Sequence, residues 1–326
     1  MGIIDRIIRA FDSFSNLGPD EIIKYGMEGE RMGIKALEQD GIHCFCNKLL
    51  PHPKKEGWFL EMDVIIYANG NIYCIDFKNM KGTITYSKKY EVQPVKKKIL
   101  FGIKEIVVEE PVFVGYDKDM ITQHKDGKYG EEVPEKHYSN PIKKVKYYIY
   151  HLKEFLSAKN DRLKTRFIYP IVAFTNNNCD ISAIHTIENN EYIIYASEID
   201  QIINSHKNGK EYEPFVIDSI TNLRTWDNIW NRKNERIYGI LISNKLSIID
   251  DHGNNASLDI SNVRNIDITR DGLLSDADHM IVTYKDGKIF ECKNFNGEIC
   301  IDVFGNKQVH KLRNLNRILT GTTQTG

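Results

Sequence analysis

Two apolar segments joined by a tight-turn sequence constrain the fold of this chain more than any other feature. Residues 59–67 and 72–80 are rich in Ile, Tyr and Phe, and the Asn-Gly pair of residues 69–70 lies between them. Asn-Gly favours the positive backbone angles of a two-residue hairpin turn. The sequence therefore predicts an antiparallel hairpin whose side chains alternate between two faces.

Charged residues interrupt both segments at alternating positions. Glu61 and Asp63 share one face of the first predicted strand, and Asp76 and Lys78 share one face of the second. A carboxylate buried without a partner is costly, and a divalent cation is one suitable partner. Mg²⁺ takes one or two carboxylates and completes its shell with water and phosphate oxygens. In this interpretation Lys78 positions the attacking water and stabilises charge on the phosphate, whereas the alternative is a solvated strand edge with an incidental Asp–Lys pair.

The first 235 residues otherwise alternate between helical and strand-like segments. Each segment is marked by helical spacing of apolar residues, or by an apolar run typical of a buried strand. The expected elements are helix 20–39, strand 42–50, helix 140–156, strand 167–175 and helix 218–232. We interpret residues 88–139, which mix lysines, a β-like run and a polar stretch, as an insertion. The alternation predicts an α/β domain over residues 20–235.

The two ends of the chain have different patterns. Residues 1–19 place isoleucine and phenylalanine at helical spacing and predict an amphipathic helix packed on the main domain. Residues 236–326 contain short strand-like runs separated by turn-forming pairs, and helical spacing follows over residues 306–319. We therefore expect a small antiparallel β domain closed by a C-terminal helix, somewhat like a pleckstrin-homology domain. Its expected role is to bind protein or to self-associate.

Composition narrows the class of protein. A hydrophobic content of 41% and a charged content of 27% are typical of a soluble globular chain. The formal net charge of −1 argues against a protein that coats DNA, but a cleaving enzyme needs only local positive charge. Six scattered cysteines and the absence of a signal-like or membrane-spanning segment favour a cytoplasmic protein without disulfides. Membrane contact is not expected.

Five elements, in chain order, resemble the nuclease-related (NERD) domain family. They are the G-x-x-G-E sequence of residues 26–30, the acidic strand of residues 61–63, the I-D-x-K-N sequence of residues 75–79 followed by Gly82, the Asn140-Pro141 pair with its helix, and the apolar strand of residues 171–175. Together they cover roughly residues 20–180. The resemblance implies a PD-(D/E)XK nuclease fold, which is a restriction-endonuclease-like mixed central sheet flanked by helices.

The same resemblance implies an active site. Its catalytic positions fall on Glu30, Asp63, Asp76 and Lys78. The three carboxylates among them would hold Mg²⁺ or Mn²⁺. This chain departs from the family in having Asp76 where Glu is usual and Lys144 where Gln is usual, and its insertion is longer.

Two lysine-rich segments flank the predicted site in the sequence. Phosphate contacts come mainly from Lys and Arg, so these segments are candidates for binding a nucleic-acid backbone, although charge runs are commonly solvated faces. The candidates are Lys96, Lys97, Lys98, Lys143, Lys144 and Lys146. DNA is the preferred partner.

The sequence as a whole predicts an endonuclease that depends on Mg²⁺ or Mn²⁺ and hydrolyses phosphodiester bonds, most simply those of DNA. Defence against foreign DNA is among the settings that fit, and homo-oligomer formation is left open. The alternative is a catalytically inactive, nuclease-like module that binds nucleic acid or protein.

Overall fold

The computed structural model describes most of the chain. The described residues are 19–39, 42–56, 58–99, 104–125, 133–207, 213–233, 235–242, 245–249, 253, 255–270, 278–303 and 305–321. The amphipathic helix expected over residues 1–19 lies outside them, apart from residue 19. The chain divides into two compact units: Met1–Ile42, Ala68–Ile149 and Phe167–Lys210 form the first, and His43–Tyr67, Tyr150–Arg166 and Glu211–Gly326 form the second.

The first unit mixes helices and strands. Its elements are α2 (Pro19–Gln39), β3 (Asn71–Lys78), β4 (Gly82–Ile99), β5 (Lys104–His124), β6 (Lys136–Ser139), α3 (Pro141–Lys159, to residue 149), β7 (Ile168–Phe174), β8 (Cys179–Asp180), β9 (Tyr192–Tyr195) and α4 (Ile199–Ser205). Strands β3, β7 and β9 run parallel, with Lys78 opposite Phe174 and Phe174 opposite Tyr195 at their carboxyl ends. Parallel strands are covered on both faces, which explains their unbroken apolar sequences.

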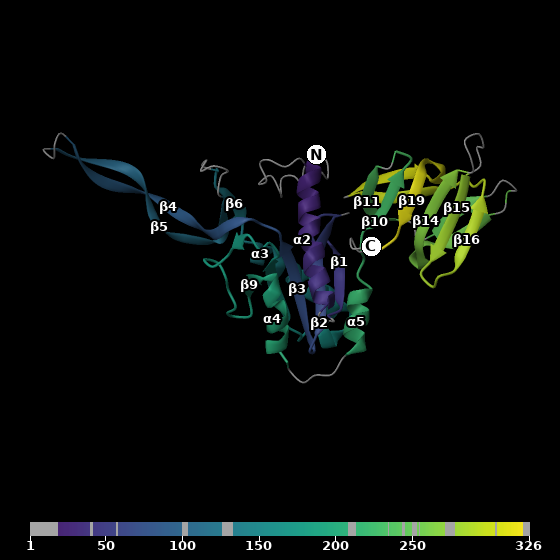
Figure 1. Ribbon diagram of the computed structural model, residues 1–326, viewed down its shortest axis with the longest axis horizontal. Coiled ribbons are helices and arrows are strands. Elements are labelled where there is room, and N and C mark those ends of the chain that lie inside the picture. The colour runs from purple at the N-terminus through teal and green to yellow at the C-terminus, as the bar shows by residue number, and fades with distance from the viewer. Residues whose placement is uncertain are drawn as a thin grey trace. The chain divides into compact units, whose positions relative to one another are not determined.

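Helix α2 packs directly on β3, and two glycines allow the close approach (Figure 1). A Cβ atom added to Gly29 would lie 2.4 Å from Cβ of Asn79, and one added to Gly33 would lie 2.3 Å from the ring of Phe77. The two glycines are four residues apart and therefore share one face of the helix. The spacing of residues 29 and 33 thus holds α2 against the carboxyl-terminal half of β3.

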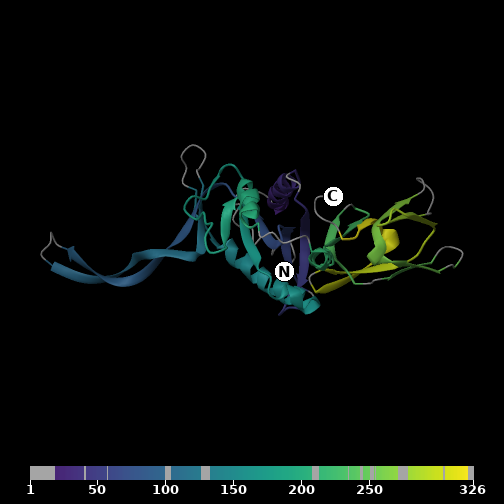
Figure 2. The same cartoon turned by 90° about the horizontal axis from the view of Figure 1, so that it is seen from below.

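A long antiparallel ribbon leaves the first unit after β3. Strands β4 and β5 pair along almost their whole length, from Thr83 opposite His124 to Ile99 opposite Lys104. At the base, β8 runs parallel to β4 and β6 antiparallel to β5, which makes a mixed four-stranded sheet. Beyond the base only β4 and β5 continue, and we call residues 87–97 and 106–119 the arm (Figures 1 and 2). The arm occupies much of the segment that the sequence marks as an insertion.

Gly82 sets the direction in which the ribbon leaves. Its φ angle is +84°, and a Cβ atom there would lie 2.1 Å from the carbonyl oxygen of His124. Its amide donates to the carbonyl of Asn178 at 2.9 Å. Only glycine fits this turn without strain.

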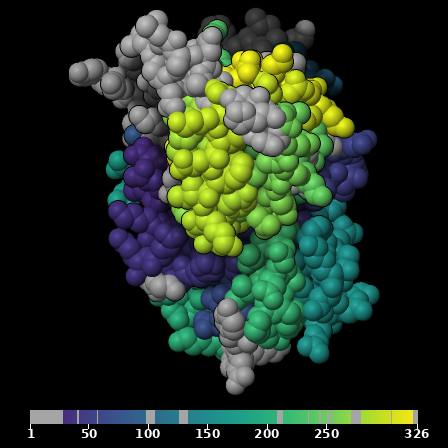
Figure 3. Space-filling model, turned by 90° about the vertical axis from the view of Figure 1, so that its right-hand side faces the viewer, coloured from purple at the N-terminus to yellow at the C-terminus, as the bar shows by residue number. Residues whose placement is uncertain are grey.

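The second unit is built mainly from antiparallel strands. Its elements are β1 (Cys44–Pro51), β2 (Phe59–Ala68), the rest of α3, α5 (Pro214–Thr221), β10 (Asp227–Asn231), β11 (Arg236–Leu241), β12 (Lys245–Ile249), β13 (Asn255–Asp259), β14 (Val263–Arg270), β15 (Asp278–Tyr284), β16 (Ile289–Lys293), β17 (Glu298–Val303), β18 (Asn306–Lys311) and β19 (Leu315–Leu319). Eight of these strands form one sheet in the order β16-β15-β14-β19-β10-β11-β17-β18. Figure 3 shows atoms of the later part of the chain, coloured green to yellow, on the face toward the viewer.

The helix expected over residues 306–319 is wrong, because β18, a 3-10 turn and β19 occupy this segment. A β-bulge explains the misleading pattern. Trp230 pairs with Arg317 but the next residue, Asn231, pairs with Leu315, so β19 holds one extra residue at that point. Leu315 and Ile318 are consequently both fully buried although they are three residues apart. A bulged strand therefore imitated helical spacing.

The helix expected over residues 218–232 is also wrong beyond its start. Helix α5 ends at Thr221, and β10 occupies Asp227–Asn231. Trp226 is buried ahead of the strand and Trp230 lies within it. The broader expectation of an α/β protein with mixed sheets and an antiparallel β domain is confirmed. Among the helices that the structure describes, none has the length and apolar character needed to cross a bilayer.

Candidate active site

The carboxylate of Asp76 is the centre of the candidate site. Asp76 lies two residues before the end of β3, opposite Val172 of β7, and only 5% of its surface is exposed. Its neighbours in the strand, Ile75 and Phe77, are also buried. An ionised carboxylate at such a position requires positive partners.

Two lysines supply that positive charge. Lys78, on the same face of β3, forms an ion pair with Oδ2 of Asp76. Lys144, from the first turn of α3, donates a hydrogen bond of 2.9 Å to Oδ1. Both ammonium groups are partly exposed, whereas the carboxylate between them is buried. The carboxylate is thus held from two elements that are distant in the sequence.

The two lysines decide the charge state of Asp76. Burial by itself raises the pKa of the Asp76 carboxyl group, but the charges of Lys144 and Lys78 and their hydrogen bonds outweigh burial and lower the pKa to about 2. Asp76 is therefore ionised at neutral pH and is able to act as a ligand or a hydrogen-bond acceptor.

Asn140 positions the helix that carries Lys144. Its side-chain oxygen accepts a hydrogen bond of 3.1 Å from the amide of Ile142 and so caps the start of α3. Its side-chain amide donates to the carbonyl of Lys118, and its backbone amide donates to the carbonyl of Asp119. These bonds tie the first turn of α3, which carries Lys144, to Lys118 and Asp119 of β5.

Glu30 approaches the same end of the sheet from α2. The adjacent residue Gly29 lies against Asn79 and Thr175, which directly follow β3 and β7. Glu30 itself is half-buried. The amide of Thr175 donates to the carbonyl of Lys78 at 3.0 Å, so the ends of both strands are joined beneath the helix. Packing of α2 therefore brings a second carboxylate to the region where β3 ends.

Asp63 lies in the second unit. It is half-buried on β2, between the buried residues Met62 and Val64. Glu61 shares its face and accepts a contact of 3.5 Å from the side-chain amide of Asn47. Of the four predicted catalytic residues, the structure joins Asp76 and Lys78 directly, and it places Glu30 on the helix that packs over their strand.

The donor chemistry at Asp76 fits a hard divalent cation. Oδ2 of Asp76 is buried and is paired with the ammonium group of Lys78. Among the described residues, no three Asp, Glu, His or Cys side chains already gather as a metal-binding group. A cation bound to Asp76 would share this carboxylate with Lys78 and Lys144. Carboxylate oxygens such as those of Asp76 and Glu30 are the ligands that Mg²⁺ prefers.

Most of the predicted nucleic-acid-binding lysines have acidic partners within the chain. The ion pairs are Lys97 with Glu110, Lys143 with Asp119, Lys144 with Asp76, and Lys146 with Glu191. Lys96 is exposed on β4, and the side chain of Lys98 lies outside the described residues. The pairing of Lys144 with Asp76 was not expected. The only signal for it in the sequence is that lysine replaces the usual Gln of the Asn-Pro element.

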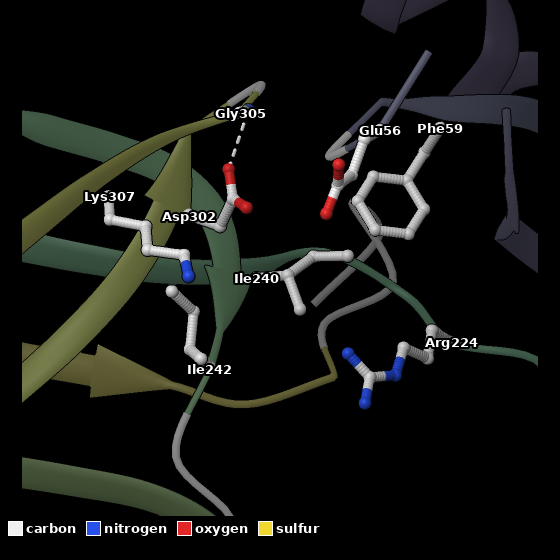
Figure 4. Close-up of a pocket in the computed structure, with 8 residues that line it drawn as sticks. All are labelled: Glu56, Phe59, Arg224, Ile240, Ile242, Asp302, Gly305 and Lys307. Carbon is white, nitrogen blue, oxygen red and sulfur yellow. Dashed lines mark hydrogen bonds between the residues drawn. The ribbon is translucent and has the colours of Figure 1, made fainter. Parts of the chain in front are cut away.

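A separate pocket of about 480 Å³ lies within the second unit (Figure 4). It is lined by two acidic, two basic and several apolar or small residues: Glu56, Phe59, Arg224, Ile240, Ile242, Asp302, Gly305 and Lys307. The Asp302 carboxylate accepts a hydrogen bond of 2.6 Å from the amide of Gly305. None of the predicted catalytic residues lines this pocket.

Comparison with known proteins identifies one family model within this chain. Residues 25–175 match the family model described as the nuclease-related domain, NERD. The matched segment contains most of α2 and all of β3 and α3, and so includes Asp76, Lys78 and Lys144. No match was found among curated proteins or among solved structures.

Proposed function

Because residues 25–175 are a nuclease-related domain, we propose that this protein is a metal-dependent nuclease whose active centre is built on Asp76 and Lys78. The observation that carries the proposal is the buried, ionised carboxylate of Asp76 between two lysines at the end of β3. A purely structural strand has little use for such a costly group. The D-x-K sequence of a nuclease-related domain gives it a chemical use.

Each residue at this centre has a proposed task. Within the first unit, Asp76 would hold a Mg²⁺ or Mn²⁺ ion, with Glu30 as a further ligand. Such an ion would supply Lewis-acid activation of the phosphate and of water. Lys78 positions the water, whose oxygen attacks phosphorus while the bond to the leaving oxygen breaks. Lys144 offers a second positive charge to the phosphate oxygens.

We also propose a specific fold for the domain and a specific substrate. The parallel strands β3, β7 and β9, with α2 packed on β3, support a restriction-endonuclease-like core. We propose DNA as the substrate, with Lys143 and Lys146 on α3 contacting its backbone on either side of Lys144. Defence against foreign DNA is the setting that we propose for such an enzyme.

A cleavage survey tests the proposal. Single-stranded DNA, duplex DNA and RNA are incubated with the full chain in Mg²⁺, in Mn²⁺ and in a chelator. Asp76→Asn and Lys78→Met are each expected to reduce metal-dependent cleavage by about 100-fold or more, because Asp76 is the proposed metal ligand and Lys78 positions the attacking water. Matched controls are Asp200→Asn and Lys164→Met, which alter exposed residues. Undiminished cleavage by Asp76→Asn would contradict the proposal.

One observation favours a second candidate function. Both oxygens of Asp76 already have a lysine partner, and Lys144 stands where the family usually has a neutral Gln. A lysine charge that takes the place of the metal charge would suit an inactive module that binds nucleic acid or protein. Calorimetric titration of Mn²⁺ into the wild type and Asp76→Asn separates the two functions. The inactive module predicts no binding to either, whereas the nuclease predicts binding that Asp76→Asn removes.

A further inference from the structure

The arm exposes several large apolar side chains on a two-stranded ribbon. Five apolar residues of the arm have exposed fractions between 48 and 68%, and they are Tyr90, Val92, Val107, Phe113 and Tyr116; Val114 is 40% exposed. A ribbon of two strands has both edges open and is marginally stable without a further layer. The arm is therefore a surface that needs a partner.

The register of the arm places four of these residues, Tyr90, Val92, Val107 and Phe113, on one side. Tyr90 lies opposite Phe113 and Val92 lies opposite Pro111. Alternate residues of a strand share a face, so the same side also carries the next pairs toward the tip. We call this side the apolar face, and its members are Tyr90, Val92, Pro94, Val107, Pro111 and Phe113, together with the charged residues Lys96 and Glu109. Ring contacts at 6.0 Å between Tyr90 and Phe113, and at 5.4 Å between Phe113 and Tyr116, make its inner end aromatic.

The two strands of the arm carry opposite charge. Strand β4 contributes four described lysines with Glu91 as the exception, and these lysines are Lys88, Lys89, Lys96 and Lys97. Strand β5 contributes four acids with Lys118 as the exception, and these acids are Glu109, Glu110, Asp117 and Asp119. A polyanion such as nucleic acid would be attracted by the first strand and repelled by the second. A second copy of the arm offers both signs of charge.

Symmetry determines which strands meet when two arms stack face to face. A two-fold axis parallel to the arm places β4 of one copy over β5 of the other. A residue that pairs with a given residue within its own ribbon then faces that same residue of the second copy. Tyr90 of one copy would meet Phe113 of the second copy. Lys96 would face Val107 of the second copy, whose Glu109 lies two residues further along the same face. A two-fold axis across the arm would instead place lysines over lysines. Only the first arrangement matches both charge and apolar surface.

From this complementarity we infer that the apolar face of the arm docks onto the same face of a second copy of this chain. The interface is isologous, since the same residues contribute from both copies, and it closes as a dimer. It does not depend on catalysis, so Asp76→Asn dimerises as the wild type does. Cleavage assays and assembly assays can therefore fail independently.

Sedimentation velocity of the full chain tests the dimer. The wild type is expected to sediment as a dimer at micromolar concentration, and the double variant Tyr90→Ser with Phe113→Ser is expected to be a monomer with an unchanged circular dichroism spectrum. The matched control is Ile289→Ser, which alters an equally exposed apolar residue outside the arm and should leave the dimer intact. A wild type that stays monomeric up to 100-fold higher concentration overturns the inference.

A mixing experiment tests the stacking arrangement itself. Lys96→Glu puts two acids together at each contact and Glu109→Lys puts two lysines together, so each variant alone should dissociate at least tenfold more readily than the wild type. When the two variants are mixed, every contact regains one acid and one lysine, and a heterodimer should form with nearly wild-type affinity. If the mixed variants form no heterodimer, the inference is overturned. It is also overturned if the wild type is a monomer whose arm binds DNA, so that Tyr90→Ser with Phe113→Ser abolishes the DNA binding.

Discussion

The ammonium group of Lys144 lies 2.9 Å from Oδ1 of Asp76, so the first turn of α3 places a positive charge on a buried carboxylate of β3. Lys78 holds the other oxygen. The second lysine therefore adds to the charge that the D-x-K strand provides by itself. Any ligand of Asp76 has to share the carboxylate with both ammonium groups.

Replacement of Lys144 by the family's usual residue should strengthen metal binding. Lys144→Gln removes a cation that competes for Asp76, and we expect Mn²⁺ to bind roughly three- to tenfold more tightly, since a partly exposed charge pair contributes on the order of 1 kcal/mol. Isothermal titration calorimetry measures the change. Lys143→Gln, next to it on α3 and paired with Asp119, is the matched control and should bind as the wild type does. Weaker binding by Lys144→Gln would show that the lysine supports the metal site.

The acid stability of the chain should report the ion pairs of Asp76. The pKa of Asp76 is lowered from 3.8 to about 2 in the folded chain, so its carboxylate stabilises the fold above pH 3.8, and this stabilisation is lost as the pH falls toward 2. A shift of this size corresponds to roughly 2 kcal/mol. Urea unfolding between pH 5 and pH 2 should show Asp76→Asn less stable than the wild type at pH 5, with a gap that closes toward pH 2. A gap that stays constant over this range would contradict the assigned pairing.

Removing the glycine contact should separate α2 from β3. Gly29→Ala adds a Cβ atom 2.4 Å from that of Asn79, a distance that the backbone can relieve only by moving the helix. We expect a loss of about 1–3 kcal/mol of stability and a fall in cleavage, since Glu30 moves with the helix. Lys35→Ala, on the exposed side of α2, should change the free energy of unfolding by less than about 0.5 kcal/mol. Equal stability of the two variants would show that α2 is free to shift.

The Asn140 cap should matter for both stability and chemistry. Asn140→Ala removes the acceptor for the amide of Ile142 and the donor to the carbonyl of Lys118, at a cost of about 1–2 kcal/mol. Asn140→Asp keeps the cap but loses the donor, so its loss of stability should be smaller. Chemical denaturation measures the free energy of unfolding, which should be highest for the wild type, lower for Asn140→Asp and lowest for Asn140→Ala. The reverse order of the two variants would place the importance of Asn140 in its contact with Lys118.

Sequence reasoning predicted the parts of this site that depend on local alternation. Asp76 and Lys78 were expected on one face of a strand, and they form an ion pair there. The apolar run of residues 167–175 was expected to be a buried strand, and Ile168–Phe174 is the parallel strand beside β3. Both predictions succeeded because a buried strand is specified by its own residues.

The contacts that the sequence did not reveal are long-range. Lys144 reaches Asp76 from 68 residues away, and the run of lysines around it was interpreted as a phosphate-binding face. The acidic partners of these lysines lie on β3, β5 and after β8, where no local pattern points to them. The position of α3 relative to β3 in the folded chain is therefore needed to distinguish a paired lysine from a solvated one.

The arm and the last strand show two further limits. In the arm both faces of β4 carry lysines, so burial imposes no alternation that would mark a long strand. In β19 the bulge at Asn316 places Leu315 and Ile318 on one side and imitates a helix. Periodicity indicates a secondary structure only where one regular face is buried.

Cleavage in isotopically labelled water tests the central claim most directly. The wild type and Asp76→Asn are incubated with the same DNA and Mn²⁺ in H₂¹⁸O, and mass spectrometry counts ¹⁸O at the new phosphate ends. An Asp76-centred hydrolase predicts one ¹⁸O at each new end for the wild type and no new ends for Asp76→Asn. Intact DNA in the wild-type reaction, or labelled ends made equally by Asp76→Asn, would contradict it.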